Sequence, residues 1–226
     1  MRDGRRRGLD RAGVGGSGIR VLSDGSANPR ARLVLAHGAG APMDSPFMNG
    51  FAGDLAKHGI EVLRFEFPYM DARRSLGKRT PPDPPAVLLA TWRGVIGQLG
   101  GGEGLFIGGK SMGGRIATMI ADESGVKGVV CLGYPFHPAG KPEKTRTQHL
   151  ETLRTPTLIV QGTRDALGSR ADVDGYSLSA SIRFHWLEDG DHSFEPRKGS
   201  GRSHPQALRE AVSAVVAFTR TTDTGS

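Results

Sequence analysis

The sequence predicts an α/β fold in which a mostly parallel sheet is covered by helices on both faces. Short apolar runs alternate along the chain with segments whose apolar residues repeat at helical spacing. Several of these runs are apolar throughout, which is typical of strands buried on both faces. The length of 226 residues suits one domain of this kind. Together these observations favour a parallel sheet with right-handed crossovers.

The apolar runs give at least six strands. They are Arg32–Ala36, Glu61–Phe67, Leu105–Gly108, Gly128–Leu132, Thr157–Gln161 and Ile182–Leu187. A further segment, Ile19–Leu22, is a candidate edge strand. Because strands and helices alternate in sequence, the strand ends that follow each run are expected at one edge of the sheet.

Helical periodicity fills the segments between these strands. The clearest start is Ser45 as N-cap with Pro46 at the first helical position, and this helix is expected to end before Gly59. Further helices are predicted over Val87–Ile96, Arg115–Ala121 and Leu208–Phe218. We expect residues 1–17 to be a flexible basic tail, residues 18–220 a single domain and residues 221–226 a second tail.

Charge and composition narrow the classes of partner. The formal net charge is +7, but five Arg and two Asp in residues 1–17 account for +3 of it, leaving +4 for the rest. The folded part is therefore only mildly basic. A second cluster, Arg73, Arg74, Lys78 and Arg79, is expected in a solvated, Pro-rich loop with few aromatic residues to stack bases, so nucleic acid is not an expected partner. We find no apolar segment of membrane-spanning length and no signal peptide, and one cysteine, Cys131, gives no internal disulfide. A cytoplasmic location is expected.

Two glycine motifs have competing interpretations. Gly13–Gly18 matches the dinucleotide fingerprint, but a basic segment precedes it and a strand-like segment follows, which favours a linker. Gly104–Ser111 matches the P-loop pattern, which leaves a nucleotide-binding protein as an alternative. Against it, Leu105–Gly108 resembles a strand, whereas a P-loop needs a phosphate-cradling loop there.

The same residues contain a G-x-S-x-G pattern, Gly109-Lys110-Ser111-Met112-Gly113. It lies after a predicted strand and before a predicted helix, as in the strained turn that exposes a nucleophilic serine. Glycines flank Ser111 where any Cβ would collide with the tight turn. The alternative is a Gly-rich connection with an exposed serine.

An acid and a histidine follow in the order that such a serine requires. Asp165 comes just past the strand TLIVQ, and His192 comes just past the strand IRFHWL. A histidine that takes the serine proton and an acid that orients it would activate Ser111. The backbone N–H groups of Ala39, in the Gly-rich turn after RLVLA, and of Met112 are the expected oxyanion donors.

On these residues the chain resembles the α/β-hydrolase fold. The segments LAHGAGAPMDSPFM, GGKSMGGR and EDGDHSF look like a small bacterial branch without a lid, related to dienelactone hydrolases and to a hydrolase-like domain in a eukaryotic histone-acetyltransferase complex. The resemblance implies the serine, aspartate and histidine roles given above. Only 24 residues separate GVVCL from TLIVQ, so a shallow, open site is expected.

Other residues keep more than one interpretation. His37 is predicted to be a hydrogen-bonded turn residue or, with Gly40, a substrate contact. His137 and Lys141 fit a substrate-binding rim and a solvated loop equally well, and Lys110 either favours an anionic substrate or lies in solvent. The rival acids, expected in loops and caps, are Asp172, Asp174, Asp189 and Asp191.

The sequence therefore predicts a serine hydrolase of the carboxylesterase or thioesterase type. It would act on a small acyl substrate through an acyl-enzyme and would need no metal or cofactor. The competing hypothesis of another class is an interaction module on the same fold with vestigial catalysis. The acyl chain, the leaving group and the oligomeric state do not follow from the sequence.

Overall fold

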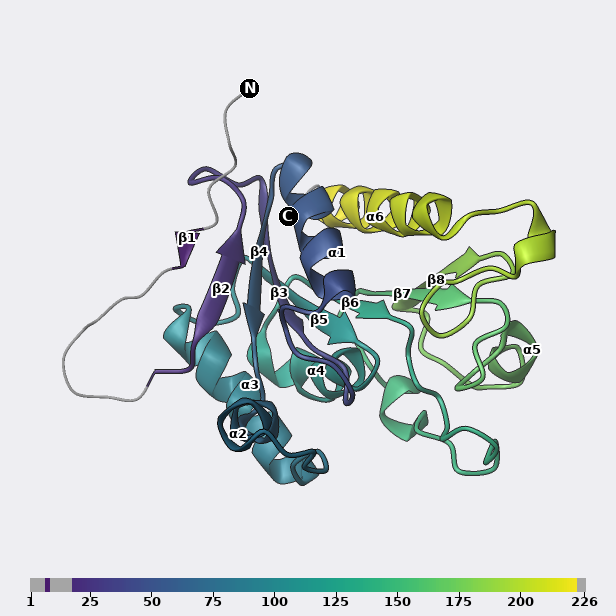
Figure 1. The fold of residues 1–226 in the computed structure, drawn as a ribbon, viewed down its shortest axis with the longest axis horizontal. Helices are drawn as coiled ribbons and strands as arrows, with labels where there is room; N and C mark the ends of the chain where they lie inside the picture. The colour runs from purple at the N-terminus through teal and green to yellow at the C-terminus, as the bar shows by residue number, and fades with distance from the viewer. Residues whose placement is uncertain (1–6, 9–17, 223–226) are drawn as a thin grey trace.

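The computed structural model of the chain describes residues 7–8 and 18–222. Its centre is a sheet in the order β1-β2-β4-β3-β5-β6-β7-β8 (Figure 1). The strands are β1 (Arg7–Gly8), β2 (Val21–Asp24), β3 (Ala31–Ala36), β4 (Ile60–Phe65), β5 (Leu105–Lys110), β6 (Gly128–Leu132), β7 (Thr157–Gly162) and β8 (Ile182–Leu187). The strands β3 to β8 pair in parallel, and β1 and β2 are antiparallel. The mostly parallel α/β sheet that the sequence predicts is confirmed.

Helices cover both faces of this sheet, with α1 and α6 on one and α3 and α4 on the other (Figure 1). The α-helices are α1 (Pro46–Lys57), α2 (Pro68–Leu76), α3 (Pro85–Gln98), α4 (Met112–Ser124), α5 (Arg170–Val173) and α6 (His204–Thr221). Single 3₁₀ turns occur at Gln148–Leu150 and Lys198–Ser200. Ser45 caps α1 by accepting a hydrogen bond from the Met48 N–H, as predicted.

The two apolar cores follow from this layering. Val34 and Ile107 point to the α3 and α4 side, where Trp92 and Ile116 are also fully buried. Leu33 and other alternate strand residues point to the α1 and α6 side. The inner strands β5, β6 and β7 therefore bury both of their faces, which is why their sequences are largely apolar.

Three expectations need correction or fall outside the structure. The segment around Arg73 and Arg74 was predicted to be a Pro-rich loop, but α2 runs from Pro68 to Leu76 with Gly77 at φ 62° as its left-handed C-cap. Its proline start and glycine stop are ordinary helix signals. Arg7–Gly8, inside the predicted tail, forms β1 and pairs with β2. The glycine motif at 13–18 lies outside the described residues except for its last position.

The P-loop alternative is wrong. Leu105–Lys110 forms β5, so the residues between the motif's glycines lie in a central strand and cannot form a phosphate-cradling loop.

Strand register brings the ends of four strands to one edge. Ala36 pairs with Gly109 across β3 and β5, and Gly162 pairs with Leu187 across β7 and β8. The loops that follow these strands therefore begin at the same level of the sheet. They carry Ser111, Asp165, His192 and the turn His37–Gly40, which we call the oxyanion turn after its predicted role. Along the described residues, no helix is long and apolar enough to cross a membrane.

The packing of α4 onto β3 predicts that Gly113→Ala destabilises the protein. A Cβ at Gly113 would stand 2.5 Å from Ala36 O and 2.7 Å from His37 O, and backbone cannot move aside cheaply. We expect a loss of about 2 kcal/mol or more in the free energy of unfolding, measured by urea denaturation.

The matched control is Gly53→Ala in α1, where no atom lies within 4 Å of the added methyl group. This variant should gain up to about 1 kcal/mol because alanine favours the helix. Equal effects of the two substitutions would contradict the steric account.

Candidate active site

Ser111 lies at a strained turn between β5 and α4. Its φ of 53° and ψ of −117° are unusual for a residue with a side chain. A Cβ at Gly109 would stand 2.3 Å from Ala36 O, so the turn admits only glycine there, as it does at Gly113. The Ser111 N–H donates to Leu132 O at 3.0 Å, which ties the turn to β6.

The structure brings the three predicted site residues into one hydrogen-bonded chain. Ser111 Oγ lies 2.9 Å from His192 Nε2, and His192 Nδ1 lies 2.7 Å from Asp165 Oδ2. Because the ionised carboxylate only accepts, Nδ1 carries the proton and Nε2 is free to accept from the serine hydroxyl. The Asp165 side chain is fully buried, whereas 28% of the His192 side chain is exposed. A substrate can therefore reach the outer end of this chain.

Asp165 is held in place by donors other than His192. Its Oδ1 accepts from the Leu167 N–H at 2.8 Å, and its Oδ2 accepts from Gln161 Nε2 at 2.9 Å. Gln161 is fully buried and also bonds the Tyr134 backbone in both directions. Sequence analysis did not identify Gln161 as part of the site, although a polar residue ending an apolar strand was a usable signal.

The rival acids are engaged elsewhere. Asp189 pairs with Arg164 and Arg197, and Asp191 accepts backbone N–H groups of its own loop. Asp172 completes a capping box at the start of α5, and Asp174 is that helix's C-cap residue. Among the described residues, none of the four forms a hydrogen bond or an ion pair with the His192 ring.

The oxyanion turn has its peptide planes fixed from outside. Gly38 O accepts from His37 Nδ1 at 2.7 Å and from the Tyr69 hydroxyl at 3.4 Å. The Gly38 carbonyl and the Ala39 N–H belong to the same trans peptide and point in opposite directions. The Ala39 N–H is therefore directed away from His37 Nδ1 and the Tyr69 hydroxyl. Met112 is the first residue of α4, so its N–H lacks an intrahelical partner. Both groups suit the predicted role of oxyanion donors.

The weaker site predictions have different outcomes. The His37 ring is fully buried and its Nε2 accepts from the Phe67 N–H, so it holds the turn and is not exposed to a substrate. Burial lowers the pKa of His37, which keeps this neutral form. His137 is also buried, with Nδ1 on Pro138 O, and so is not a rim residue. Gly40 and Lys141 are exposed.

A model of the alpha/beta hydrolase domain matches residues 29–220. The chain belongs to the α/β-hydrolase family. It is similar to the dienelactone hydrolase of Anabaena variabilis, with 19% identity, TM-score 0.66 and coverage of 90% of this chain and 91% of that one. It is also similar to a serine hydrolase without a lid from Xanthomonas campestris, with 18% identity, TM-score 0.63 and coverage of 90% of this chain and 88% of that one. The esterase domain of a Rhodothermus marinus protein has 17% identity, TM-score 0.63 and coverage of 89% of this chain and 92% of that one.

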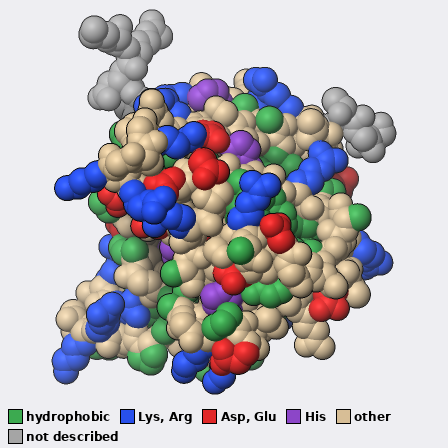
Figure 2. Space-filling model, turned by 90° about the vertical axis from the view of Figure 1, so that its right-hand side faces the viewer, with side chains coloured by type: hydrophobic (Ala, Val, Ile, Leu, Met, Phe, Trp, Pro, Cys, Tyr) green, Lys and Arg blue, Asp and Glu red, His purple; other side chains and the backbone are tan. Residues whose placement is uncertain are grey.

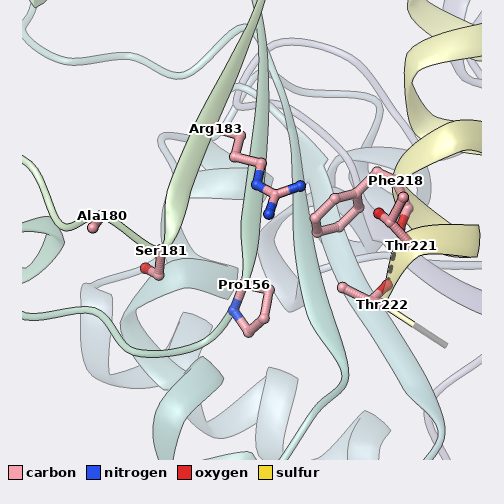
Figure 3. Close-up of a pocket in the computed structure, with 7 residues that line it drawn as sticks. All are labelled: Pro156, Ala180, Ser181, Arg183, Phe218, Thr221 and Thr222. Carbon is pink, nitrogen blue, oxygen red and sulfur yellow. Dashed lines mark hydrogen bonds between the residues drawn. The ribbon is translucent and has the colours of Figure 1, made fainter. Parts of the chain in front are cut away.

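The hydrolase has no lid among its described residues. Residues 133–156, where a lid would be inserted, contain only the 3₁₀ turn Gln148–Leu150. On the face that carries β8 and α5, Lys and Arg are interspersed with Asp and Glu (Figure 2). A hollow of about 170 Å³ between the amino ends of β7 and β8 and the end of α6 includes Pro156 and Arg183 (Figure 3). It lies at the sheet edge opposite Ser111.

Lys110, beside the nucleophile, is turned inward and not into solvent. Its Nζ donates to the His192 carbonyl at 2.7 Å and lies 5.8 Å from the ring centres of Phe47 and Phe194. Burial lowers the pKa of Lys110 to about 8, against the opposing effects of Asp165 and Asp191. The ammonium therefore fixes the backbone of the histidine that faces Ser111.

Lys110→Met tests this positioning role. Methionine keeps most of the buried volume but removes the donor to His192 O, so the imidazole should lose its fixed place. We expect kcat/KM for p-nitrophenyl acetate to fall about tenfold or more, because small misplacements of catalytic groups cost rate. The melting temperature should not fall, since a desolvated charge is removed. Unchanged kcat/KM would contradict the positioning role.

His149 is a half-buried histidine that lies against α4, the helix that follows Ser111. Its Nε2 lies 2.9 Å from Thr118 Oγ1, whose hydroxyl donates to Arg115 O, so the ring donates from Nε2. Burial, and then the charge of Arg115, lower the pKa of His149 to about 4. No sequence pattern predicts this pairing, because the contact joins segments 31 residues apart.

The lowered pKa of His149 predicts that stability falls with acidity. An unfolded histidine binds its proton near pH 6.5, so between pH 6.5 and about 4 the unfolded chain holds more protons than the folded one. The free energy of unfolding should therefore decrease as pH falls through this range. His149→Gln keeps an N–H donor and should reduce that decrease by about 1 kcal/mol, allowing for partial exposure of the ring.

Urea unfolding at pH 7 and pH 4.5 measures the effect. The control is His58→Gln, which replaces an exposed histidine at the end of α1. A decrease in stability that is the same in wild type, His149→Gln and His58→Gln would refute the assignment to His149.

Proposed function

We propose that this chain is a serine hydrolase that cleaves an ester or thioester of a small acyl group. One observation carries the proposal: the hydrogen-bonded chain from Ser111 Oγ through His192 to Asp165, with distances of 2.9 and 2.7 Å. A serine hydroxyl is a poor nucleophile unless a histidine takes its proton. In the hydrogen-bonded chain, His192 is that base, and its bond to Asp165 favours the required tautomer.

The reaction follows from these positions. Ser111 Oγ attacks the carbonyl carbon while its proton passes to His192 Nε2, and Asp165 stabilises the imidazolium. The Ala39 and Met112 N–H groups receive the oxyanion. When the tetrahedral intermediate collapses, the bond to the leaving group breaks and His192 returns the proton to it. Water then repeats the sequence on the acyl-enzyme, which releases the acid and frees Ser111.

Two features support esters or thioesters over amides. The described residues form no lid over Ser111, so little surface is available to distort a resonance-stabilised amide. The structurally similar proteins include an esterase domain and a dienelactone hydrolase, although at 17% and 19% identity.

Ser111→Ala should abolish hydrolysis of p-nitrophenyl acetate, by a factor on the order of 10⁵ to 10⁶ if the three residues act as a unit. A fluorophosphonate probe should add to the intact wild-type protein, and mass spectrometry should locate the adduct on Ser111. Removing one hydroxyl should leave the fold unchanged.

Ser213→Ala, which changes an exposed serine of α6, is the matched control and should be labelled like wild type. Retention of more than about a tenth of wild-type activity in Ser111→Ala would exclude Ser111 as nucleophile. Absence of both labelling and hydrolysis in wild type would instead favour the interaction module.

A further inference from the structure

A basic groove lies between α2 and the segment that follows the oxyanion turn. The α2 groove, as we call it, has a volume of about 440 Å³. Four of its eight lining residues are cations and none is an acid; the eight are Gly40, Pro42, Met70, Arg73, Arg74, Gly77, Lys78 and Arg79. A concave site with this lining is suited to a negatively charged group.

The cations of the groove differ in how far they are neutralised. Arg74 is paired with Glu66 at 2.7 Å and with Asp44 at 2.6 Å, so its charge is compensated. Arg73 bonds only carbonyl oxygens, Thr80 O and Ala39 O, and lies over the Tyr69 ring.

Lys78 and Arg79 are exposed and have no ion pair among the described residues. Three positive charges of the groove, those of Arg73, Lys78 and Arg79, are therefore uncompensated. By contrast, Arg93, an exposed arginine of α3, is paired with Glu123 at 2.7 Å. The groove thus combines a hollow with an excess of positive charge, whereas an isolated surface lysine has no hollow beside it.

The groove is joined directly to the reaction centre. Arg73 Nη1 donates to Ala39 O at 3.1 Å, in the oxyanion turn, and Gly40 of the same turn lines the groove. A methyl group at Gly38 would stand 3.6 Å from Ser111 Cβ. Since consecutive Cα atoms are about 3.8 Å apart, Gly40 and the near end of the groove lie within about 12 Å of Ser111, which a substrate chain of about 10 Å can span.

We propose that the α2 groove binds an anionic group of the substrate, a carboxylate or phosphate that a chain of about 10 Å separates from the scissile carbonyl. The proposal rests on the proposed function, because it takes Ser111 as the reacting group. Arg73 lies at the inner end, where its guanidinium also fixes the oxyanion turn. Lys78 and Arg79 complete the site from the loop after α2.

The preference should be moderate and sensitive to salt. Exposed charge pairs are individually weak, so two or three together give roughly a tenfold preference. Screening at high ionic strength should reduce it. An apolar contact of the linking chain would not respond to salt in this way.

The test compares matched esters. The substrates are the mono-p-nitrophenyl ester of suberic acid, its methyl ester as the neutral counterpart, and the p-nitrophenyl ester of 7-phosphonoheptanoic acid. In wild type, kcat/KM at low salt should be about tenfold higher for the acids than for the methyl ester. Whichever acid is preferred more strongly identifies the anion as carboxylate or phosphate.

Variants locate the preference. In Lys78→Gln/Arg79→Gln the ratio of acid to methyl ester should fall toward one. Arg93→Gln removes an exposed arginine of α3 outside the groove and should keep the wild-type ratio. A ratio of one in wild type, or a ratio that persists in the double variant, would overturn the proposal. In the second case the anion would bind elsewhere, for example at Arg115, beside the nucleophile on α4.

Pyrophosphate binding separates this proposal from the proposed function. Calorimetric titration of the full chain with pyrophosphate should show binding in wild type and Ser111→Ala, and weaker binding in the double variant. If no ester is hydrolysed but this pattern holds, the proposed function fails and the groove remains an anion site. If esters are hydrolysed without preference and pyrophosphate does not bind, the groove proposal fails alone.

Discussion

The site depends on the close packing of α4 and β5 against β3, with no side chain between their backbones at Gly109 and Gly113. At Gly109 and Gly113 a Cβ would fall within 3 Å of the Ala36 carbonyl oxygen, so the helix can pack onto the strand only through bare backbone. That approach places Ser111 at a φ of 53° above the sheet edge. The strain is local, and the surrounding parallel strands, buried on both faces, hold it.

Backbone groups rather than side-chain clusters give the site its geometry. Gln161 bonds the Tyr134 backbone and Asp165, Lys110 bonds the His192 carbonyl, and His37 bonds the Gly38 carbonyl. Gln161 joins the ends of the neighbouring strands β7 and β6, and Lys110 joins the end of β5 to the loop after β8. The His37 bond lies within the turn after β3. A shift in strand register would therefore misplace the oxyanion donors, the base and the acid together. This coupling explains why a shallow site on loops is still ordered.

The sequence was sufficient for the sheet, four helices and the proximity of Ser111, Asp165 and His192, because apolar period and strand-end position determine them. It was insufficient for residues whose role is set by distant contacts. Lys110 is the last residue of β5 and has a flexible, charged side chain, so its inward direction depends on the loop of His192, 82 positions away. The prediction missed α2 because it took the basic residues around Arg73 as a sign of a solvated loop. It did not use Pro68 as a helix start or Gly77 as a helix end.

The same error concealed the groove. In a solvated loop, Arg73 would be one more mobile cation, whereas on α2 it is directed at Ala39 O and stacked on Tyr69. Because α2 orders this segment, Arg73 can hold the oxyanion turn through Ala39 O. Lys78 and Arg79 remain available to bind an anion in the groove. Because the described residues form no lid over Ser111, the proposed selection of substrates would depend on the charges of the α2 groove.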